Sequence, residues 1–299
     1  GYGFQSDSDG NFIIRGYSQG VYHVEANGQV YVDDNWEWPY QREYYSDSPD
    51  RDGAASIQIT AGSETPNIHF TLEDGVTISG TVTRQDNSEP IQDTNVNVYD
   101  SNWQHVSGDN TDSDGKYAIG GFPAGSYYVE ATGWGHFDGQ WQRLYIGEYY
   151  NESPDQSGAT LVVVTDVATG IDFTLEEGGS ISGTVTHAGA FVANANVQVW
   201  GSNWDGYGGV QTDSNGIYTL SGLPTGSYYV AADGQVYVDD NWEWPYQQEY
   251  YNNSPDQDGA DLVPVTIGGD TSGINFTLVE GVTISGTVTR QDNSEPIQD

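Results

Sequence analysis

The chain has 299 residues, of which 35% are hydrophobic and 13% are aromatic, enough for the cores of about two or three domains. Its 44 Asp and Glu residues against 7 Lys and Arg residues give a formal net charge of -37. This charge excludes a protein that binds the phosphate backbone of a nucleic acid, and it disfavours anionic membrane surfaces. The absence of cysteine excludes disulfides and thiol chemistry and leaves the redox compartment undetermined.

The sequence shows neither a membrane span nor a signal peptide. It contains no run of about 18 apolar residues, and no basic segment is followed by an apolar stretch. The chain starts at Gly1, not at a methionine. It ends at Asp299 inside a motif that also occurs earlier in the chain, where the sequence continues beyond this point. We therefore expect a window of a longer protein, with any export signal outside it.

Internal repeats dominate the sequence. Residues 76–93 recur unchanged at 282–299, and residues 28–45 recur almost unchanged at 234–251, both 206 residues further on. The motif ISGTVT starts at Ile78, Ile181 and Ile284, which gives a unit of 103 residues. Such periodicity is typical of a tandem array of one structural module.

The strand motif FTLE and the glycine after it set the boundaries. We expect a first repeat, 1–74, that lacks its first strands, complete second and third repeats, 75–177 and 178–280, and a terminal segment, 281–299, that is the first strand of a further repeat. Linkers are almost absent, because each repeat runs directly into the next first strand. Short connections favour a stiff rod.

Short apolar runs separated by Gly, Asp and Pro turns predict seven strands and no helix in the second repeat. The predicted strands are 76–83, 95–99, 116–119, 126–132, 144–149, 160–165 and 171–175. Alternation places these residues on inner faces: Ile78, Val82, Val96, Val98, Tyr127, Val129, Phe173 and Leu175. The chain is therefore predicted to be all-β, a tandem array of seven-stranded, immunoglobulin-like β-sandwich domains.

Three motifs carry a resemblance to a known family. They are ISGTVT at Ile78, TDSDGKYAIGGFPAGSYYVEA at Thr111 and GIDFTLEEGGSISGTVT at Gly170. They resemble the carboxypeptidase regulatory-like repeat, which is related to collagen-adhesin B-type domains. The second motif returns from Thr212 and from Ser6, although residues 17–20 depart from its Pro-x-Gly turn. The resemblance thus covers nearly the whole chain.

The resemblance implies a transthyretin-like β-sandwich without catalysis, in a secreted or surface protein of a prokaryote. It implies use as a spacer, an adhesive module or a filament-building module. Collagen-adhesin domains often carry an internal Lys-Asn crosslink. Lys116 is the single lysine of this chain, so such a crosslink cannot recur in each repeat.

A recurring acidic turn raises the question of calcium. The Asp-x-Asp/Asn-Gly motif supplies Asp7 and Asp9, then Asp112 and Asp114, then Asp213 and Asn215. Oxygen ligands of this kind suit Ca²⁺, but the same residues are favoured in tight turns. The high negative charge and the acidic loops 33–34 and 239–240 favour bound cations, whereas adaptation to salty water explains the charge equally well. No cofactor is required, and calcium is a hypothesis.

Two nearly identical loops are rich in aromatic residues. They contain Trp36, Trp38, Tyr40, Trp242, Trp244 and Tyr246. They hold more rings than one sandwich edge is expected to bury, so we expect a contact surface. Packing between domains or subunits is favoured, and binding of glycans is the second interpretation.

Two further sequence features concern modification and catalysis. Asn-x-Ser/Thr sequons at Asn151, Asn252 and Asn275 are hypothetical glycosylation sites, and the first two occupy equivalent positions. The five histidines share no metal-ligand spacing, and no arrangement of catalytic side chains recurs between repeats. We therefore expect no enzyme.

The leading functional hypothesis is a structural subunit of an extracellular filament or surface stalk. Residues Val282, Ile284, Gly286 and Val288 are predicted to act as a donor strand. Either the array continues covalently, or this strand completes the open first repeat of another copy, head to tail. The alternative is a carbohydrate-binding or adhesive module array. The organism, the repeat number and the surface anchor are beyond the sequence.

Overall fold

The computed structural model describes residues 3–32, 35–137, 140–203, 206–238, 241–288 and 290. All the regular elements among them are β-strands, so none of these residues forms a helix that could cross a membrane. Contacts divide the chain into two units. The first unit holds residues 1–83, 90–131 and 148–173, and the second holds residues 84–89, 132–147 and 174–299.

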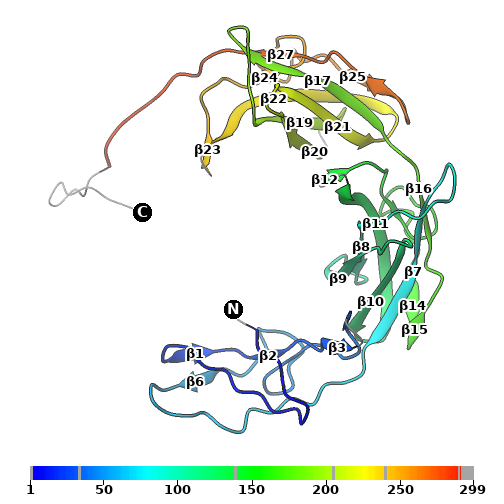
Figure 1. The fold of residues 1–299 in the computed structure, drawn as a ribbon, viewed down its shortest axis with the longest axis vertical. Coiled ribbons are helices and arrows are strands. Elements are labelled where there is room, and N and C mark those ends of the chain that lie inside the picture. Colours follow the sequence, from blue (N-terminus) through cyan, green and yellow to red (C-terminus); the bar gives the residue numbers. More distant parts are fainter. Residues whose placement is uncertain are drawn as a thin grey trace. The chain divides into compact units, whose positions relative to one another are not determined.

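The second repeat forms two sheets around one core (Figure 1). The first sheet consists of β7 (Val76–Arg84), β10 (Lys116–Phe122), β15 (Val167–Ala168) and β16 (Phe173–Leu175). The second consists of β8 (Thr94–Tyr99), β9 (His105–Asn110), β11 (Gly125–Phe137), β12 (Gln140–Arg143), β13 (Glu148–Tyr149) and β14 (Val162–Val164). Strand β7 pairs antiparallel with β10 on one edge and parallel with β15 on the other.

The third repeat has the same two-sheet arrangement. Its first sheet consists of β17 (Gly179–His187), β18 (Ala190–Phe191), β21 (Ile217–Leu223), β26 (Asp270–Thr271) and β27 (Phe276–Leu278). Its second consists of β19 (Ala195–Gly201), β20 (Gly206–Gln211), β22 (Gly226–Val238), β23 (Asn241–Glu243), β24 (Glu249–Tyr250) and β25 (Val263–Val265). The all-β tandem sandwich predicted from the sequence is confirmed.

The first repeat contains three two-stranded sheets. They pair β1 (Gly20–Tyr22) with β6 (Ile57–Ile59), β2 (Glu25–Ala26) with β5 (Glu43–Tyr44), and β3 (Val30–Val32) with β4 (Asn35–Glu37). Ile57, at 6% exposed, is the one hydrophobic residue of the buried class among the described residues of this repeat. Without a long central strand, the remaining apolar side chains stay partly open to solvent.

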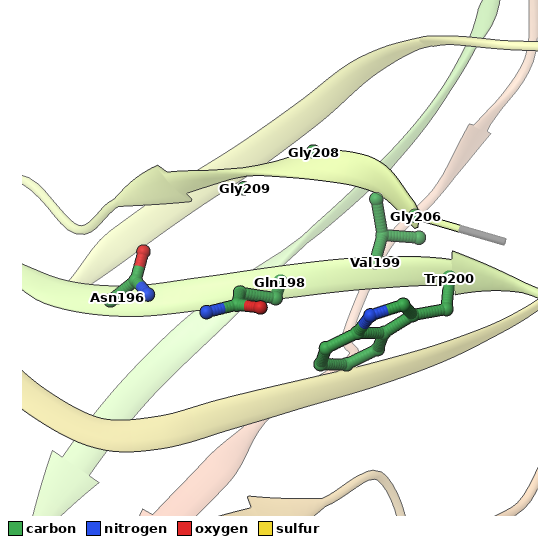
Figure 2. Close-up of a pocket in the computed structure, with 7 residues that line it drawn as sticks. All are labelled: Asn196, Gln198, Val199, Trp200, Gly206, Gly208 and Gly209. Carbon is green, nitrogen blue, oxygen red and sulfur yellow. The ribbon is translucent and has the colours of Figure 1, made fainter. Parts of the chain in front are cut away.

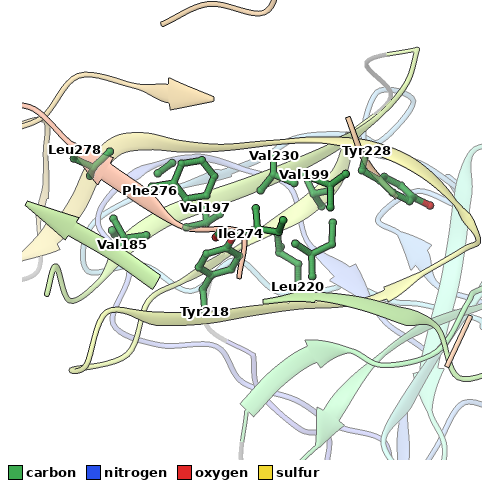
Figure 3. Packing of buried hydrophobic residues seen from close by; sticks show 14 of the residues in the cluster. Val185, Val197, Val199, Tyr218, Leu220, Tyr228, Val230, Ile274, Phe276 and Leu278 are labelled. Carbon is green, nitrogen blue, oxygen red and sulfur yellow. Dashed lines mark hydrogen bonds between the residues drawn. The ribbon is translucent and has the colours of Figure 1, made fainter. Parts of the chain in front are cut away.

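Alternation along the strands builds the cores. Strand β8 shows it plainly, because every second residue from Thr94 to Tyr99 is buried. All eight inner residues predicted for the second repeat are buried, with Tyr127, at 7%, the most exposed of them. Figure 3 shows the corresponding cluster of the third repeat, with Val197, Tyr218, Ile274 and Phe276 in its middle.

In each complete repeat a buried tyrosine hydroxyl donates a hydrogen bond to a backbone carbonyl group near the end of the repeat. The Tyr218 hydroxyl donates a 2.6 Å hydrogen bond to the Ile274 carbonyl oxygen, and Tyr117 does the same for Ile171. Burial raises the pKa of Tyr218, so its hydroxyl keeps the donated proton at neutral pH. The bond satisfies the buried carbonyl group of Ile274, which lies between β26 and β27.

Strands β9, β12 and β15 were not predicted from the sequence. The β9 residues HVSGDN are mostly polar and half or fully exposed, so they show no apolar alternation. Backbone pairing with β8 forms this strand, from Asn95 opposite Asn110 to Tyr99 opposite His105. The predicted strand 144–149 is present only as β13.

We expect Tyr218→Phe to lower the free energy of unfolding of the third repeat by about 1–3 kcal/mol, because the buried Ile274 carbonyl loses its partner. Chemical denaturation followed by tryptophan fluorescence measures the change. Tyr237→Phe is the matched control, since it removes a hydroxyl from a half-exposed ring outside the core cluster. Equal stability of the two variants would contradict the prediction.

Candidate functional site

A loop of each repeat, residues 39–41, 144–146 and 245–247, is bound by backbone hydrogen bonds to the last residues of that repeat and to the first residue after it. In the third repeat the Gln247 amide donates to the Val279 carbonyl at 2.9 Å, and the Gly281 amide donates to the Pro245 carbonyl at 2.8 Å. The loop of the first repeat is bound in the same way, by residue 41 to residue 73 and by residue 39 to residue 75. The loop of the second repeat is bound by residue 146 to residue 176 and by residue 144 to residue 178. The loop therefore fixes the point at which each repeat ends.

A glycine lies beneath each of these loops. Gly28, Gly133 and Gly234 have φ values of 73°, 70° and 76°. A Cβ atom at Gly234 would lie 2.3 Å from the Tyr246 carbonyl oxygen. A Cβ atom at Gly28 would lie 2.1 Å from the carbonyl oxygen of residue 40, and one at Gly133 would lie 2.1 Å from that of residue 145. Both the left-handed backbone and the close approach require glycine.

We expect Gly234→Ala to destabilise the third repeat by about 2–4 kcal/mol, because the added methyl group clashes with backbone and the φ value is unfavourable. Gly268→Ala is the matched control. Gly268 has a φ of 67°, but a Cβ there meets no atom within 4 Å, so only the conformational cost of about 1 kcal/mol remains. Urea denaturation compares the two variants, and an equal loss of stability would contradict a specific role for the loop contact.

The predicted aromatic surface is partly exposed. Trp244 is 67% exposed and Trp38 is 41% exposed. Within the first unit Trp38 lies beside Gly121, where a Cβ would be 3.3 Å from the Trp38 Cβ. The Trp242 ring is 5.0 Å from that of Tyr237, and the Tyr246 ring is 4.9 Å from that of His187.

The other members of the predicted surface are less informative. Tyr40 is 37% exposed and pairs through its backbone with Asp74. The Trp36 side chain and the acidic loops 33–34 and 239–240 lie outside the described residues. A role for these loops in contacts between domains, between subunits or with glycans stays a prediction.

The predicted donor segment forms no strand between residues 281 and 288. Val282, Ile284 and Val288 are 91%, 97% and 70% exposed, and a Cβ at Gly286 would meet nothing within 4 Å. The same sequence forms β7, where Val76, Ile78 and Val82 are 5%, 0% and 0% exposed. One sequence therefore occurs once as core and once as exposed chain.

The first repeat exposes an apolar side chain whose counterpart in the second repeat is buried beside such a strand. Ile14 is 38% exposed, whereas its counterpart Ile119 is 1% exposed and pairs with Ile78 of β7. Ile13 and Val21 are exposed as well, at 64% and 61%, but their counterparts Ala118 and Ser126 lie on outer faces of the second repeat and are not covered by β7. Ile14 thus lacks in the first repeat the cover that β7 gives to Ile119 in the second.

The acidic turns use their carboxylates to hold their own backbone. Oδ1 of Asp7 accepts the amides of Asp9 and Asn11, and Oδ1 of Asp213 accepts those of Asn215 and Ile217. These bonds, from Asn11 and Ile217 above all, lower the pKa values of the two carboxyls. The Asp112 carboxylate holds the amides of Asp114 and Lys116 in the same way.

Calcium stays a prediction at these turns. Among the described residues, no three His, Asp or Glu side chains gather closely enough to hold a metal ion. Unfolding the chain with and without a chelator tests the hypothesis. Structural calcium predicts a lower unfolding temperature with the chelator, because ions that bind the folded state stabilise it; an unchanged temperature would rule it out.

The sequon residues lie at the surface. Asn151 and Asn252 occupy equivalent turns with φ values of 70° and 68°. Asn275 is exposed, but its Oδ1 accepts the Thr184 amide at 2.9 Å and so links β17 to the segment before β27. Attachment of a glycan at any of the three stays a prediction.

A groove that no sequence pattern indicated lies on the outer face of the third repeat. It has a volume of about 450 Å³ and is lined by Asn196, Gln198, Val199, Trp200, Gly206, Gly208 and Gly209. Figure 2 shows the side chains of residues 196, 198 and 200 in a row along β19, next to the glycines of β20. The adjacent glycines, which carry no pattern of their own, open this space.

Comparison with known proteins gives one family match. The carboxypeptidase regulatory-like domain matches residues 77–176 and 180–279, which is more than half of the chain. No curated protein matches the chain.

Several solved structures are similar at low identity. The Bacillus anthracis TIE protein has 14% identity and a TM-score of 0.27, over 87% of this chain and 42% of that chain. The minor pilin GBS52 of Streptococcus agalactiae has 13% identity and a TM-score of 0.31, over 71% and 99%. The shaft pilin spaA of Lactobacillus rhamnosus GG has 10% identity and a TM-score of 0.29, over 71% and 99%. TM-scores this low carry no argument about function, which rests on the residues of this chain.

Proposed function

Because the chain belongs to the carboxypeptidase regulatory-like domain family, we propose that it is a structural, non-enzymatic subunit of a filament or stalk outside a prokaryotic cell or on its surface. Its repeats join head to tail. The observation that carries this proposal is the contrast between residues 282–288, whose apolar side chains are exposed, and the identical residues 76–82, which are buried in β7.

The pairing of β7 supplies a register for the joint. In the second repeat Ile119 pairs with Ile78, and Ala118 pairs with Ser79. Transferred to the open first repeat, the same register places Ile14 opposite Ile284 and Ile13 opposite Ser285. The acceptor in this proposal is a second copy of the chain.

Burial supplies the driving force. Val282, Ile284 and Val288 expose most of their surface, and each side chain contributes about 1.5–3 kcal/mol when it is fully buried. Backbone hydrogen bonds to the open edge add direction and specificity, as in other cases of strand addition. A donor segment and an acceptor sheet on one chain form a heterologous contact, which propagates into a filament.

Engineered disulfides test this register. We expect Ile13→Cys combined with Ser285→Cys to give a ladder of covalent oligomers under oxidising conditions, because directly opposed residues lie within disulfide reach. The chain has no cysteine of its own, so the introduced pair is the only one. Gel electrophoresis without reducing agent measures the ladder.

The matched control is Ile13→Cys combined with Thr283→Cys, which lies one diagonal position away and should crosslink much less. Equal crosslinking of both pairs would contradict the register. Electron microscopy of the unmodified chain at high concentration tests the proposal itself. Isolated monomers without polymers would overturn it.

A further inference from the structure

The second and third repeats differ on one outer face. On β19 of the third repeat, Trp200 lies opposite Gly206 and Gln198 lies opposite Gly209. On β8 of the second repeat, Tyr99 lies opposite His105 and Asn97 lies opposite Gly108. The two faces are therefore in register, and they differ in Gly206 in place of His105 and in Asp233 in place of Thr132.

His105 covers its face in the second repeat. Its Nε2 lies 3.1 Å from the Asn97 Oδ1, and its ring is 5.7 Å from the Tyr99 ring. The Tyr99 hydroxyl donates to the Glu130 carboxylate at 2.8 Å. The polar groups of this face thus satisfy one another.

Among the described residues of the third repeat, no side chain takes the place of His105; residues 204 and 205, directly before Gly206, lie outside them. A Cβ at Gly206 would meet no atom within 4 Å. The groove of about 450 Å³ occupies this side of the strand (Figure 2). Trp200 forms its aromatic wall, half-buried and 6.2 Å from the Tyr250 ring.

Asp233 fixes the orientation of the two amides in the groove. The Gln198 Nε2 donates to the Asp233 Oδ2 at 2.9 Å, and the Asn196 Nδ2 donates to the same oxygen. A carboxylate only accepts hydrogen bonds, so both amides must turn their NH₂ groups toward it. Their carbonyl oxygens then face away, and each NH₂ keeps a second hydrogen to donate.

We propose that this groove of the third repeat binds a neutral glycan. An aromatic ring beside fixed amide donors and acceptors matches the two faces of a hexopyranose, which has an apolar ring surface and hydroxyl groups that both donate and accept. The net charge of -37 disfavours acidic sugars. This site is independent of the filament joint and of the aromatic loops.

Titration of the full chain with maltopentaose, cellopentaose and chitopentaose tests the proposal by calorimetry. We expect at least one of these sugars to bind with one site per chain. Gly206→His introduces the side chain that covers the second repeat, so it should weaken that binding by about tenfold or more, which corresponds to about 1.4 kcal/mol. Gln198→Met removes the amide while keeping the chain length, and it should weaken binding as well.

Gly206→Ala is the matched control, because a methyl group fits the open space and should leave the affinity unchanged. The unfolding temperature of each of the three variants is measured as a control. A value equal to that of the unmodified chain shows that the variant is folded. Absence of binding by all three sugars would overturn the proposal. Undiminished affinity of a folded Gly206→His variant would overturn it as well.

Discussion

Pairing of the first strand of a repeat with neighbours on both of its edges is the interaction on which each complete sandwich depends. Strand β7 lies between β10 and β15, and this position buries Ile78 and Val82 completely. Gly80 lies in the middle of this strand, and a Cβ atom there would be only 2.0 Å from the Ile171 carbonyl oxygen. Glycine at this position therefore allows the neighbouring backbone to approach closely. The same residues without neighbours are an exposed apolar segment, and this dependence makes a joint between chains physically reasonable.

The aromatic loop gives this strand a defined starting point. The amide of Gly75, directly before β7, donates a hydrogen bond to the Pro39 carbonyl oxygen of the first repeat. The amide of Gly178, directly before β17, donates in the same way to the Leu144 carbonyl oxygen of the second repeat. The first residue of the second repeat and that of the third are thus each held by a loop of the repeat before, and the first strand of the new repeat begins one residue later. Each of these repeats therefore contacts the start of the next, as repeats do in nearest-neighbour arrays.

The sequence predicted the parts of the fold that depend on alternation and missed those that depend on pairing. Val96, Val98 and Phe173 alternate with polar residues, and all are buried. Strand β9 has no such pattern, because β8 supplies its hydrogen bonds and its side chains remain outside the core. The groove was missed for a related reason. The space beside Gly206 is open because this residue of β20 has no side chain, and a single glycine forms no sequence pattern.

The comparison of repeats separates positions that maintain the frame from positions that vary. Inward-facing Val96 and Val98 of β8 correspond to Val197 and Val199 of β19, and all four are at most 1% exposed. Their outward-facing neighbours change from Asn97 and Tyr99 to Gln198 and Trp200. Because side chains of successive residues point to opposite faces, these outward changes leave the core volume untouched. A tandem array of this kind can therefore keep one core while the outward-facing side chains differ between repeats.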